Sequence, residues 1–409
     1  MFGGIDWATA DHAVAVHSDD GMKRWRYALP HSRDGFDRLV GWLARFGDPA
    51  GLPIAIERPD GRLVDRLLEA GHPVVAVKTT AIKAWRESEV PSGAKSDPGD
   101  ADVIADYLRV RHQQLRVLAP FCDATKALRT VVRVRDDLVD QRVAAINQLA
   151  ALLDAFWPGA KAIFADVESP TALSFLERYP TPASAARLGD KRMAAFCAKV
   201  RYSGGRTPAE LLERLRGAPA GIADAAGTAA GGDAVLAMVT VLRALNAAIK
   251  DLERSIQARL AGHPDGEVFT SLPRSGMVNA AQMLAEWGDC RGAYTGPESV
   301  AALAGQTPVT KQSGKHTSIG FRWSCNKRFR NAMHTFADNS RHASPWAAGV
   351  YADAKTRGHD HQHALRILGR AWIRVIYRCW TDGVAYDATL HGATRRLAAA
   401  AVADQQTAA

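Results

Sequence analysis

The chain has 409 residues, of which 47% are hydrophobic, with a formal charge of +9 and a pI of about 9.4. This length suits two or three domains with real cores, and the basic balance suits a polyanionic partner. Five scattered cysteines without a CxxC pair argue against a zinc site or a disulfide frame, and no signal peptide or apolar run of membrane length is present, so we expect a cytoplasmic, nucleoid-associated protein.

Strands and helices alternate in the first third of the chain. Residues 3–17 read as strand, turn and strand, and residues 24–29 as a third strand. Apolar residues at helical spacing predict an amphipathic helix over 32–46, followed by a strand over 52–59, a helix over 61–70 and a strand over 73–77. This order predicts a mixed α/β sheet.

Four acids stand out in this region. Asp6 ends the first strand and Glu57 ends a later one, while Asp97 and Asp100 open a helix in the stretch KSDPGDADVIADYLR. The pattern places Asp97 at the N-cap and Pro98 at the first helical position, and the two aspartates share one face. Helix capping alone would also explain this pair.

The two strand acids favour a metal site over simple capping. An acid at the end of an apolar strand is costly to bury unless it is paired or binds a cation. Four converging carboxylates would therefore need a divalent cation, and hard oxygen ligands suit Mg²⁺ or Mn²⁺. The order strand-Asp, strand-Glu and then DxxD on a helix resembles the RNase H/RuvC nuclease fold.

The middle of the chain is expected to be helical. Residues 121–156 form one long helix with a heptad-like apolar stripe, which favours a coiled-coil arm over a helix packed on its own domain. Residues 157–216 read as helices broken at prolines, and 217–233 as a flexible small-residue linker. A second long helix over 234–261 would return antiparallel, which leaves about 157–232 as an insertion at the tip.

The last third is basic. Residues 268–284 read as helix, tight turn and helix, whose turn amides can hold a DNA phosphate. Between Ala301 and Arg341 seven lysines and arginines face one aspartate, with Phe321, Trp323 and Phe329 interleaved, which favours nucleic-acid contact over a solvated face of mixed charge. The candidate nucleic-acid-binding residues are Lys311, Lys315, His316, Arg322, Lys327, Arg328 and Arg330.

Within this basic stretch, Ser313 precedes a glycine in the run QSGKH. Such a serine is most often a turn residue. Its position among phosphate-binding cations also makes it a candidate nucleophile, which would need a neighbouring group to take or stabilise its proton. Further on, His359, His361 and His363 favour a polar helix start over a metal cluster, because alternate residues on a helix do not share a face.

Taken in order, these motifs resemble the DEDD transposases of insertion sequences of the one-ten type, which are bridge-RNA-guided serine recombinases. The acids match in GIDWA, AIERP and KSDPGDA, and the late motifs match in SLPRSG, LAGQTPVTKQSGKH and CNKRFRNAM. The resemblance covers residues 1–155 and 234–385.

The resemblance implies a mechanism and partners. Ser313 would attack a DNA phosphate and leave a covalent 5′-phosphoserine, with Asp6, Glu57, Asp97 and Asp100 holding Mg²⁺ (or Mn²⁺) at that phosphate. The RuvC-like domain and the C-terminal domain would join across protomers of a homo-oligomer, a dimer or tetramer. A structured noncoding guide RNA would select donor and target double-stranded DNA, and no membrane would be involved.

The chain departs from the family pattern in two places. The usual PGIG hairpin reads Pro273-Arg274-Ser275-Gly276, which also offers Ser275 as a rival nucleophile, and a usual GN reads Cys325-Asn326. Three other functions stay open: a RuvC-type nuclease that uses water, an actin-like ATPase or sugar kinase, and a non-catalytic RNA or DNA scaffold. The kinase is disfavoured because Trp7-Ala8 follows Asp6 where those folds place glycine and a small hydroxyl residue.

The expected layout has four parts. An α/β RNase H/RuvC-like domain spans 1–118, and a helical coiled-coil middle with its insertion spans 119–262. A mainly α C-terminal transposase domain spans 263–390, and a disordered tail spans 391–409.

Overall fold

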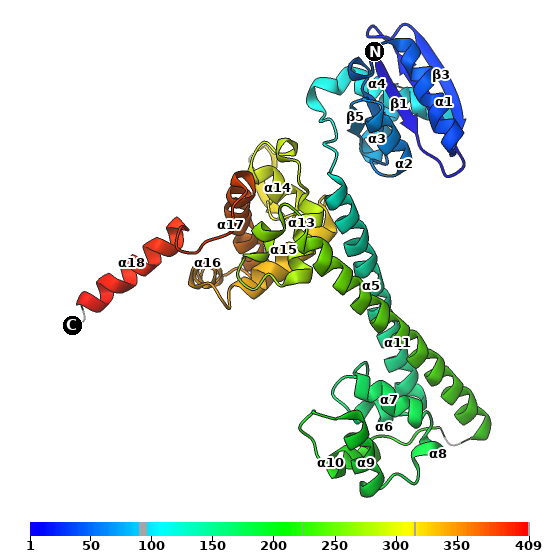
Figure 1. The fold of residues 1–409 in the computed structure, drawn as a ribbon, viewed down its shortest axis with the longest axis vertical. Coiled ribbons are helices and arrows are strands. Elements are labelled where there is room, and N and C mark those ends of the chain that lie inside the picture. Colours follow the sequence, from blue (N-terminus) through cyan, green and yellow to red (C-terminus); the bar gives the residue numbers. More distant parts are fainter. Residues whose placement is uncertain (90–95, 223, 315, 408–409) are drawn as a thin grey trace. The chain divides into compact units, whose positions relative to one another are not determined.

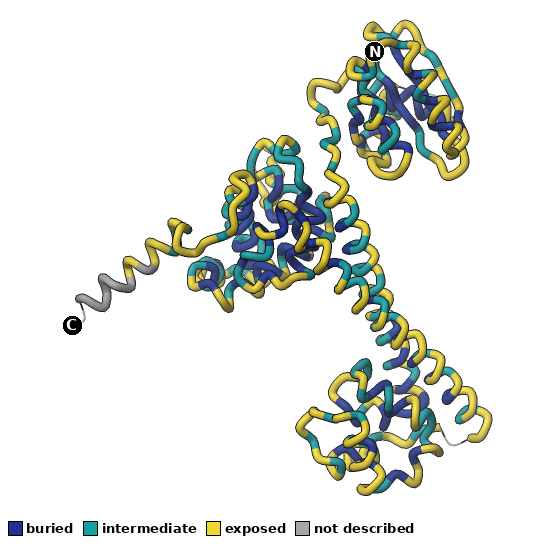
Figure 2. Tube along the Cα trace, viewed as in Figure 1, coloured by how far each residue is buried: buried dark blue, intermediate teal, exposed yellow. Residues whose placement is uncertain are grey.

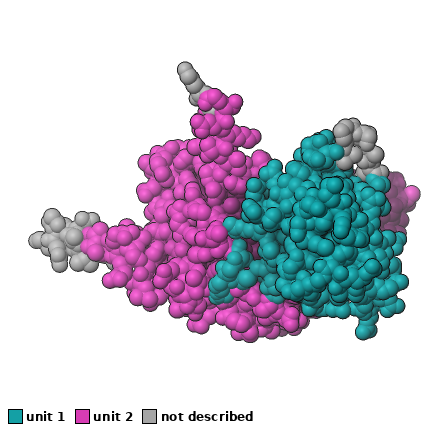
Figure 3. Space-filling view, turned by 90° about the horizontal axis from the view of Figure 1, so that it is seen from above, with its two compact units in different colours: residues 1–121, 290–293 teal, residues 122–289, 294–409 magenta. Residues whose placement is uncertain are grey.

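The structure is a computed structural model that describes residues 1–89, 96–222, 224–314 and 316–407. The chain divides into two compact units (Figures 1 and 3). The first holds Met1–Phe121, with Cys290–Ala293 grouped to it, and the second holds Cys122–Asp289 and Tyr294–Ala409. Each unit is described by itself.

The first unit is built on a mixed five-stranded sheet of order β3-β2-β1-β4-β5, as the sequence predicted. Strands β1, β2 and β3 are antiparallel, and β4 and β5 continue the sheet parallel to β1. Such a sheet is compatible with an RNase H-like domain. The strands are β1 (Phe2–Asp6), β2 (Asp11–His17), β3 (Arg24–Pro30), β4 (Ile54–Ile56) and β5 (Val74–Ala76).

Helix α4 lies unusually close to the sheet. The helices of this unit are α1 (Arg33–Leu43), α2 (Arg62–Glu69), α3 (Thr79–Glu89) and α4 (Asp97–Arg111). A Cβ on Gly4 of β1 would lie 2.3 Å from the backbone nitrogen of Ala105, so only glycine lets the helix backbone approach this strand. Buried alanines of the neighbouring strand β2 and of α4 complete the contact: Ala13, Ala15, Ala101 and Ala105.

A buried ion pair fixes α4 on the sheet. Asp102 contacts His17 Nε2 of β2 at 3.0 Å and Arg26 Nη2 of β3 at 2.5 Å. Burial pushes the pKa of Asp102 upward, but the bonds from His17 and Arg26 outweigh it and hold the pKa below its ordinary value. The first turn of α4 is therefore held at the end of β1.

Two long helices form the arm of the second unit. Helix α5 (Asp123–Phe156) and helix α11 (Ala225–Ala261) pack along one another (Figure 1). The expected linker over 217–233 is wrong for most of its length, because α11 already begins at Ala225. A Cβ on Gly231 would lie 2.3 Å from the ring of Phe156, so this glycine serves close helix packing rather than flexibility.

The insertion at the arm's end has its own hydrophobic core (Figure 2). Four of its prolines (Pro158, Pro170, Pro182 and Pro208) begin helices rather than break them, since proline at the first helical position gives up no hydrogen bond. The core is centred on Phe175 and Phe196. The helices are α6 (Pro158–Ala162), α7 (Pro170–Arg178), α8 (Pro182–Ala185), α9 (Asp190–Val200) and α10 (Pro208–Gly217).

The C-terminal part packs around three buried tryptophans, Trp287, Trp372 and Trp380. Leu128 and Ile256 from the base of the arm belong to the same core, which explains why arm and C-terminal part form one unit instead of two. Its elements are α12 (Gly266–Thr270), α13 (Met277–Trp287), α14 (Pro297–Leu303), β6 (Val309–Ser313), β7 (His316–Gly320), α15 (Lys327–Ser340), α16 (Pro345–Thr356) and α17 (His361–Asp382).

The end of the chain differs from expectation. Instead of a disordered tail, Gly392–Thr407 form helix α18. Its run of alanines explains the difference, because alanine has the highest intrinsic helix propensity. Among the described residues, α11 alone is long and apolar enough to pass for a membrane span by length and composition, and it packs along α5.

Candidate active site and nucleic-acid interface

The four predicted acids line one cavity of the first unit. Asp6 stands at the end of β1, Glu57 directly follows β4, and Asp97 and Asp100 lie in the first turn of α4. All four border the same cavity of about 420 Å³, together with Thr79, Lys83, Arg86 and Ile104. Parallel strands β1 and β4 end at the same edge of the sheet, and α4 lies across it, so residues far apart in sequence meet there.

The helix cap differs from the expected one. Ser96, not Asp97, is the N-cap residue, and its hydroxyl accepts a hydrogen bond from the Gly99 backbone nitrogen at 3.3 Å. Serine is as good a cap as aspartate, and its use leaves Asp97 out of the capping bond. Asp97 and Asp100 therefore sit one turn apart on the face that borders the cavity.

A cation from the protein already sits at this cavity. Arg86 of α3 pairs with the buried Asp100 at 2.7 Å, and Thr79 donates a hydrogen bond to Glu57 at 3.3 Å. Among the described residues no three acids, histidines or cysteines are gathered closely enough to hold a metal ion. The donor set fits Mg²⁺ in kind, because it is made of carboxylates, but in this conformation Arg86 neutralises one of the donors.

Ser313 stands at the tip of a β-hairpin in the second unit. Strands β6 and β7 pair antiparallel with Ser313 opposite His316, which leaves a two-residue turn. Gly314 in that turn has a φ of +56°, a conformation that glycine adopts without strain. The side chain of Ser313 is exposed, so its hydroxyl is open to a large substrate.

Ser275, the rival nucleophile, is only 4% exposed. It lies in the turn between α12 and α13, where the helix, turn and helix were predicted. Arg274 replaces the glycine that the related hairpins carry, and it holds the φ of +54° that glycine would suit better. Arg274 therefore holds a left-handed backbone conformation in this turn, and burial makes Ser275 a poor candidate for attack on DNA.

Asn326, next to the second departure, has a structural role. It caps α15 by accepting from the Phe329 nitrogen at 3.2 Å and donates to Glu286 at 2.6 Å. Glu286 is 3% exposed and is also paired with Arg133 and Arg129 of α5. Burial raises the pKa of Glu286, but these donors outweigh it and hold the pKa below its usual value. This network ties the C-terminal part to the arm.

The predicted nucleic-acid contacts fall into three groups. Lys311 and Lys327 are exposed. Arg322 donates to the Thr307 carbonyl at 3.2 Å, Arg328 is held by Asp137 at 2.6 Å and Arg330 lies over the Phe321 ring at 5.4 Å, so all three have protein partners. Lys315 and the side chain of His316 lie outside the described residues.

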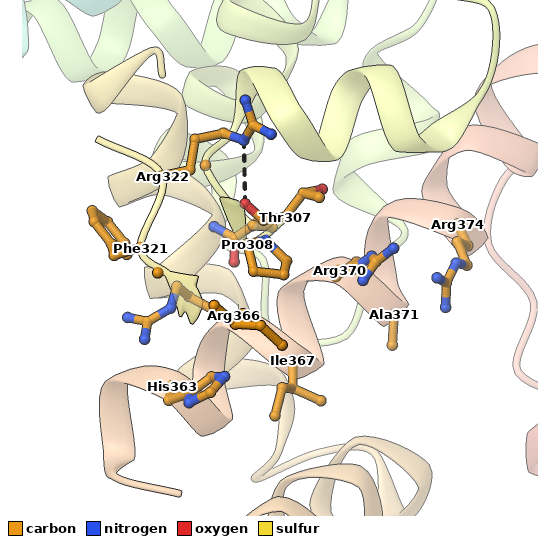
Figure 4. A pocket seen from close by; sticks show the side chains of 14 residues that line it. Thr307, Pro308, Phe321, Arg322, His363, Arg366, Ile367, Arg370, Ala371 and Arg374 are labelled. Atoms are coloured by element: carbon orange, nitrogen blue, oxygen red, sulfur yellow. Dashed lines mark hydrogen bonds between the residues drawn. The ribbon is translucent and has the colours of Figure 1, made fainter. Parts of the chain in front are cut away.

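Three further arginines were not predicted as site residues. Arg366, Arg370 and Arg374 follow one another every fourth position on α17 and, with Arg322, line a cavity of about 380 Å³ (Figure 4). The repeated spacing is visible in the sequence LRILGRAWIRVIYR and could have been found there. The histidines nearby are a helix start, as predicted: Asp360 caps α17 by accepting from the His363 nitrogen at 2.7 Å.

Two transposase family models match this chain. Residues 3–158 match the model of the DEDD transposases of the IS110 type. Residues 266–352 match the model of the transposase IS116/IS110/IS902 family. The two matched regions contain the four acids and Ser313, respectively.

Relatives match over almost the whole length. The mini-circle transposase for IS117 of Streptomyces coelicolor is 32% identical over 396 residues, which cover 93% of either chain. The 42 kDa protein of insertion element IS900 of Mycobacterium paratuberculosis is 26% identical over 98% of this chain and 99% of its own length. The 43.6 kDa protein of insertion element IS110 of S. coelicolor is 28% identical over 95% of this chain and 96% of its own.

Proposed function

This chain belongs to the IS110/IS116 transposase family of insertion elements, and we propose that it cuts and rejoins DNA through a covalent serine intermediate. The observation that carries the proposal is the pairing of two features in one chain. One unit has four carboxylates around a single cavity, and the other presents an exposed serine at the tip of a basic hairpin.

Ser313 would act as the nucleophile. Its Oγ attacks a DNA phosphate, the new Oγ–P bond replaces the bond to the 3′ oxygen, and a 5′-phosphoserine and a free 3′-hydroxyl result. The phosphoserine conserves the energy of the phosphodiester, so the broken strand can be rejoined to another end without ATP. Lys311 on the same strand stands where it can attract the phosphate to the hairpin.

The acidic cavity would hold Mg²⁺ (or Mn²⁺) through Asp6, Glu57, Asp97 and Asp100. A bound divalent ion would stabilise charge on the phosphate oxygens during transfer. The protein's own part is to hold the carboxylates at one edge of the sheet, which it does through the close contact of α4 with β1 at Gly4. Release of Asp100 from Arg86 would free a further donor.

Target choice would be left to a structured noncoding guide RNA that pairs with donor and target DNA, as the family resemblance implies. Support comes from the basic surfaces, which carry many cations suited to phosphates. Phosphate contacts position a nucleic acid without reading its sequence. The same resemblance implies that acids and serine meet from different protomers of a homo-oligomer.

A Ser313→Ala variant tests the proposal. We expect loss of the protein–DNA adduct on a denaturing gel together with loss of strand joining, while DNA and RNA binding persist. Ser318→Ala is the matched control, because Ser318 is an exposed serine on the other strand of the same hairpin. It should keep full activity.

A metal-dependent nuclease that uses water is the second candidate. One observation favours it: all four acids lie in the first unit, where they need no serine to form a cavity. Full DNA cleavage by the Ser313→Ala variant, with no adduct in the wild type, would establish this alternative and refute the serine mechanism.

A further inference from the structure

The arginine-lined cavity of the second unit lies between helix α17 and the segments that flank the hairpin. It is bordered by Gly305–Pro308 on the chain's way into β6 and by residues 319–322 at the end of β7. Figure 4 shows Arg366, Arg370 and Arg374 along α17 and Arg322 across from them. The cavity is therefore next to the hairpin that carries Ser313.

Positive charge exceeds negative charge at this cavity. Among the described residues, no acidic side chain lines it. Glu298 of α14 bonds Arg370 at 2.8 Å and Arg374 at 2.9 Å, and so compensates one charge while holding both guanidinium groups in place. Arg322 donates to the Thr307 carbonyl at 3.2 Å. Arg366 is acted on by Asp360, the N-cap residue of α17, so the four arginines are opposed by two acids and positive charge remains in excess.

Arg366 lies in an environment of like charge. Burial lowers the pKa of Arg366, and Arg330 lowers it further, while Asp360 opposes both effects without cancelling them. Burial together with Arg366 and Arg330 lowers the pKa of His334 to about 4. Clustered cations that outnumber the acids beside them favour the binding of an anion, since an anion lowers their mutual repulsion.

Two polar atoms of the cavity wall lack a partner. Gln306 is 3% exposed, and its Oε1 has no hydrogen-bond partner, while its Nε2 donates to the Ala304 carbonyl. The hydroxyl of Thr307 is also buried without a partner. Buried polar groups in proteins are nearly always bonded, so these two atoms point to a ligand that supplies hydrogen-bonding groups.

An exposed aromatic side chain stands at the rim. Phe321 lines the cavity and lies beneath Arg366 at 5.0 Å. The rings of Trp323 and Phe321 form a T-shaped pair with a centroid distance of 4.8 Å, and Trp323 is 76% exposed. An indole face left open beside phosphate-binding cations is suited to stack an unpaired base.

We propose that this cavity binds a single nucleic-acid strand, with a backbone phosphate held by Arg322, Arg366 and Arg370 and a neighbouring base stacked on Trp323. The inference rests on the proposed function, because it assumes that this chain handles nucleic acid. It adds a site that would hold an unpaired strand beside the catalytic hairpin. The strand can be displaced DNA or a loop of RNA, which share this backbone and flat bases.

Fluorescence anisotropy with the full-length protein in EDTA tests the site. The probes are a thymidine oligonucleotide, a uridine oligonucleotide and a DNA duplex. We expect Arg366→Gln to weaken binding of an unpaired strand and to reduce the slope of log K against log salt by about 0.7, the value for one lost single-strand phosphate contact. Trp323→Ala should weaken binding of the unpaired strand about tenfold, which is the middle of the range for one stacked base.

The matched control is Arg378→Gln, four residues beyond Arg374 on the same helix, α17. Arg378 is 81% exposed and pairs with Asp382, outside this cavity. It should leave affinity and salt slope for the unpaired strands unchanged. Preference for the thymidine over the uridine probe would identify DNA as the strand, and the reverse would identify RNA.

Equal losses of affinity for the unpaired strands in Arg366→Gln and Arg378→Gln would overturn the proposal. It would also be overturned if the duplex bound more tightly than the unpaired strands and Trp323→Ala left that binding unchanged. These outcomes are independent of the serine mechanism, because the assay in EDTA requires no cutting. An unchanged salt slope in Arg366→Gln, with the protein–DNA adduct still formed, would refute the cavity proposal and leave the serine mechanism intact. If Ser313→Ala instead refuted the serine mechanism, the binding results for the cavity would still hold.

Discussion

Arg86 is the residue whose position most affects the chemistry proposed for the acids. Its guanidinium contacts Asp100 at 2.7 Å, and its side chain is 21% exposed. A fixed cation at a carboxylate competes with a metal ion for the same oxygens. Arg86 thus neutralises one of the four neighbouring carboxylates, and it would weaken ion binding at the proposed metal site.

Replacing Arg86 by glutamine should tighten binding of Mn²⁺ to the protein without DNA. We expect a dissociation constant lower by about tenfold, which corresponds to about 1.4 kcal/mol. Isothermal titration calorimetry measures it directly. Lys83→Gln is the control, because Lys83 borders the same cavity but pairs with Glu87 at 3.9 Å. Unchanged Mn²⁺ affinity in Arg86→Gln would show that the arginine does not compete.

At the residue scale, the sequence allowed the four acids to be predicted but not their surroundings. Strand ends and a DxxD pattern indicate where carboxylates meet. Arg86 gave no such signal, since its partner lies on another helix and depends on how α3 packs against α4. The cap was misassigned because Ser96 and Asp97 are both good capping residues and stand side by side.

Among the elements, α4 decides whether the acids converge. Gly4 sets its distance from the sheet, and Asp102, bonded to His17 and Arg26, sets its rotation. The pKa of Asp102 is lowered in the folded protein, so the ionised form is the one that stabilises docking. That stabilisation is complete above the ordinary value of 3.8 and is lost as the pH falls through the lower folded value.

Asp102→Asn should therefore lower the free energy of local opening of α4 at neutral pH. The difference in this free energy between the variant and the wild type should shrink in acid. We expect this free energy of local opening to fall by about 1–3 kcal/mol, because a buried donor is left with a poorer acceptor. Amide hydrogen exchange of α4 measures it without requiring two-state unfolding of the whole chain. Asp106→Asn on the same helix, which loses bonds to Arg109 and Trp85, serves as the comparison. Equal exchange at neutral pH in Asp102→Asn and wild type would contradict the anchoring role.

Element types were predictable where apolar spacing was regular, as in the five strands and α5. The small-residue segment before α11 was not, because glycine and alanine have no spacing that distinguishes a flexible linker from a close helix contact. Only the ring of Phe156 against Gly231 shows which of the two it is. The prolines of the insertion were ambiguous for a similar reason: proline both ends one helix and begins the next.

For the molecule as a whole, the acids and the serine belong to different units. If they meet from different protomers, a mixed oligomer should regain activity that each single variant lacks. We expect Asp6→Ala and Ser313→Ala to be inactive alone and partly active when combined, measured as strand joining in vitro. Two copies of the same variant mixed together are the control. Failure of the mixture, with both proteins forming oligomers, would place acids and serine within one chain.

The division into units was the least predictable feature. Sequence patterns locate helices, but the shared core of Leu128, Ile256 and the tryptophans arises from contacts between segments more than a hundred residues apart. A reader of the sequence alone sees an arm followed by a domain. The packing joins them into one body.

That shared core has a consequence during synthesis on the ribosome. The acid-bearing unit is complete, apart from a short segment, once about the first third of the chain has emerged, and domains fold as they emerge. The core beneath the serine hairpin needs Leu128 from the start of α5 and Trp380 from the end of α17, so it closes only when translation is nearly finished. A nascent or prematurely terminated polypeptide would thus carry the four carboxylates before the core of the part that presents Ser313 has formed.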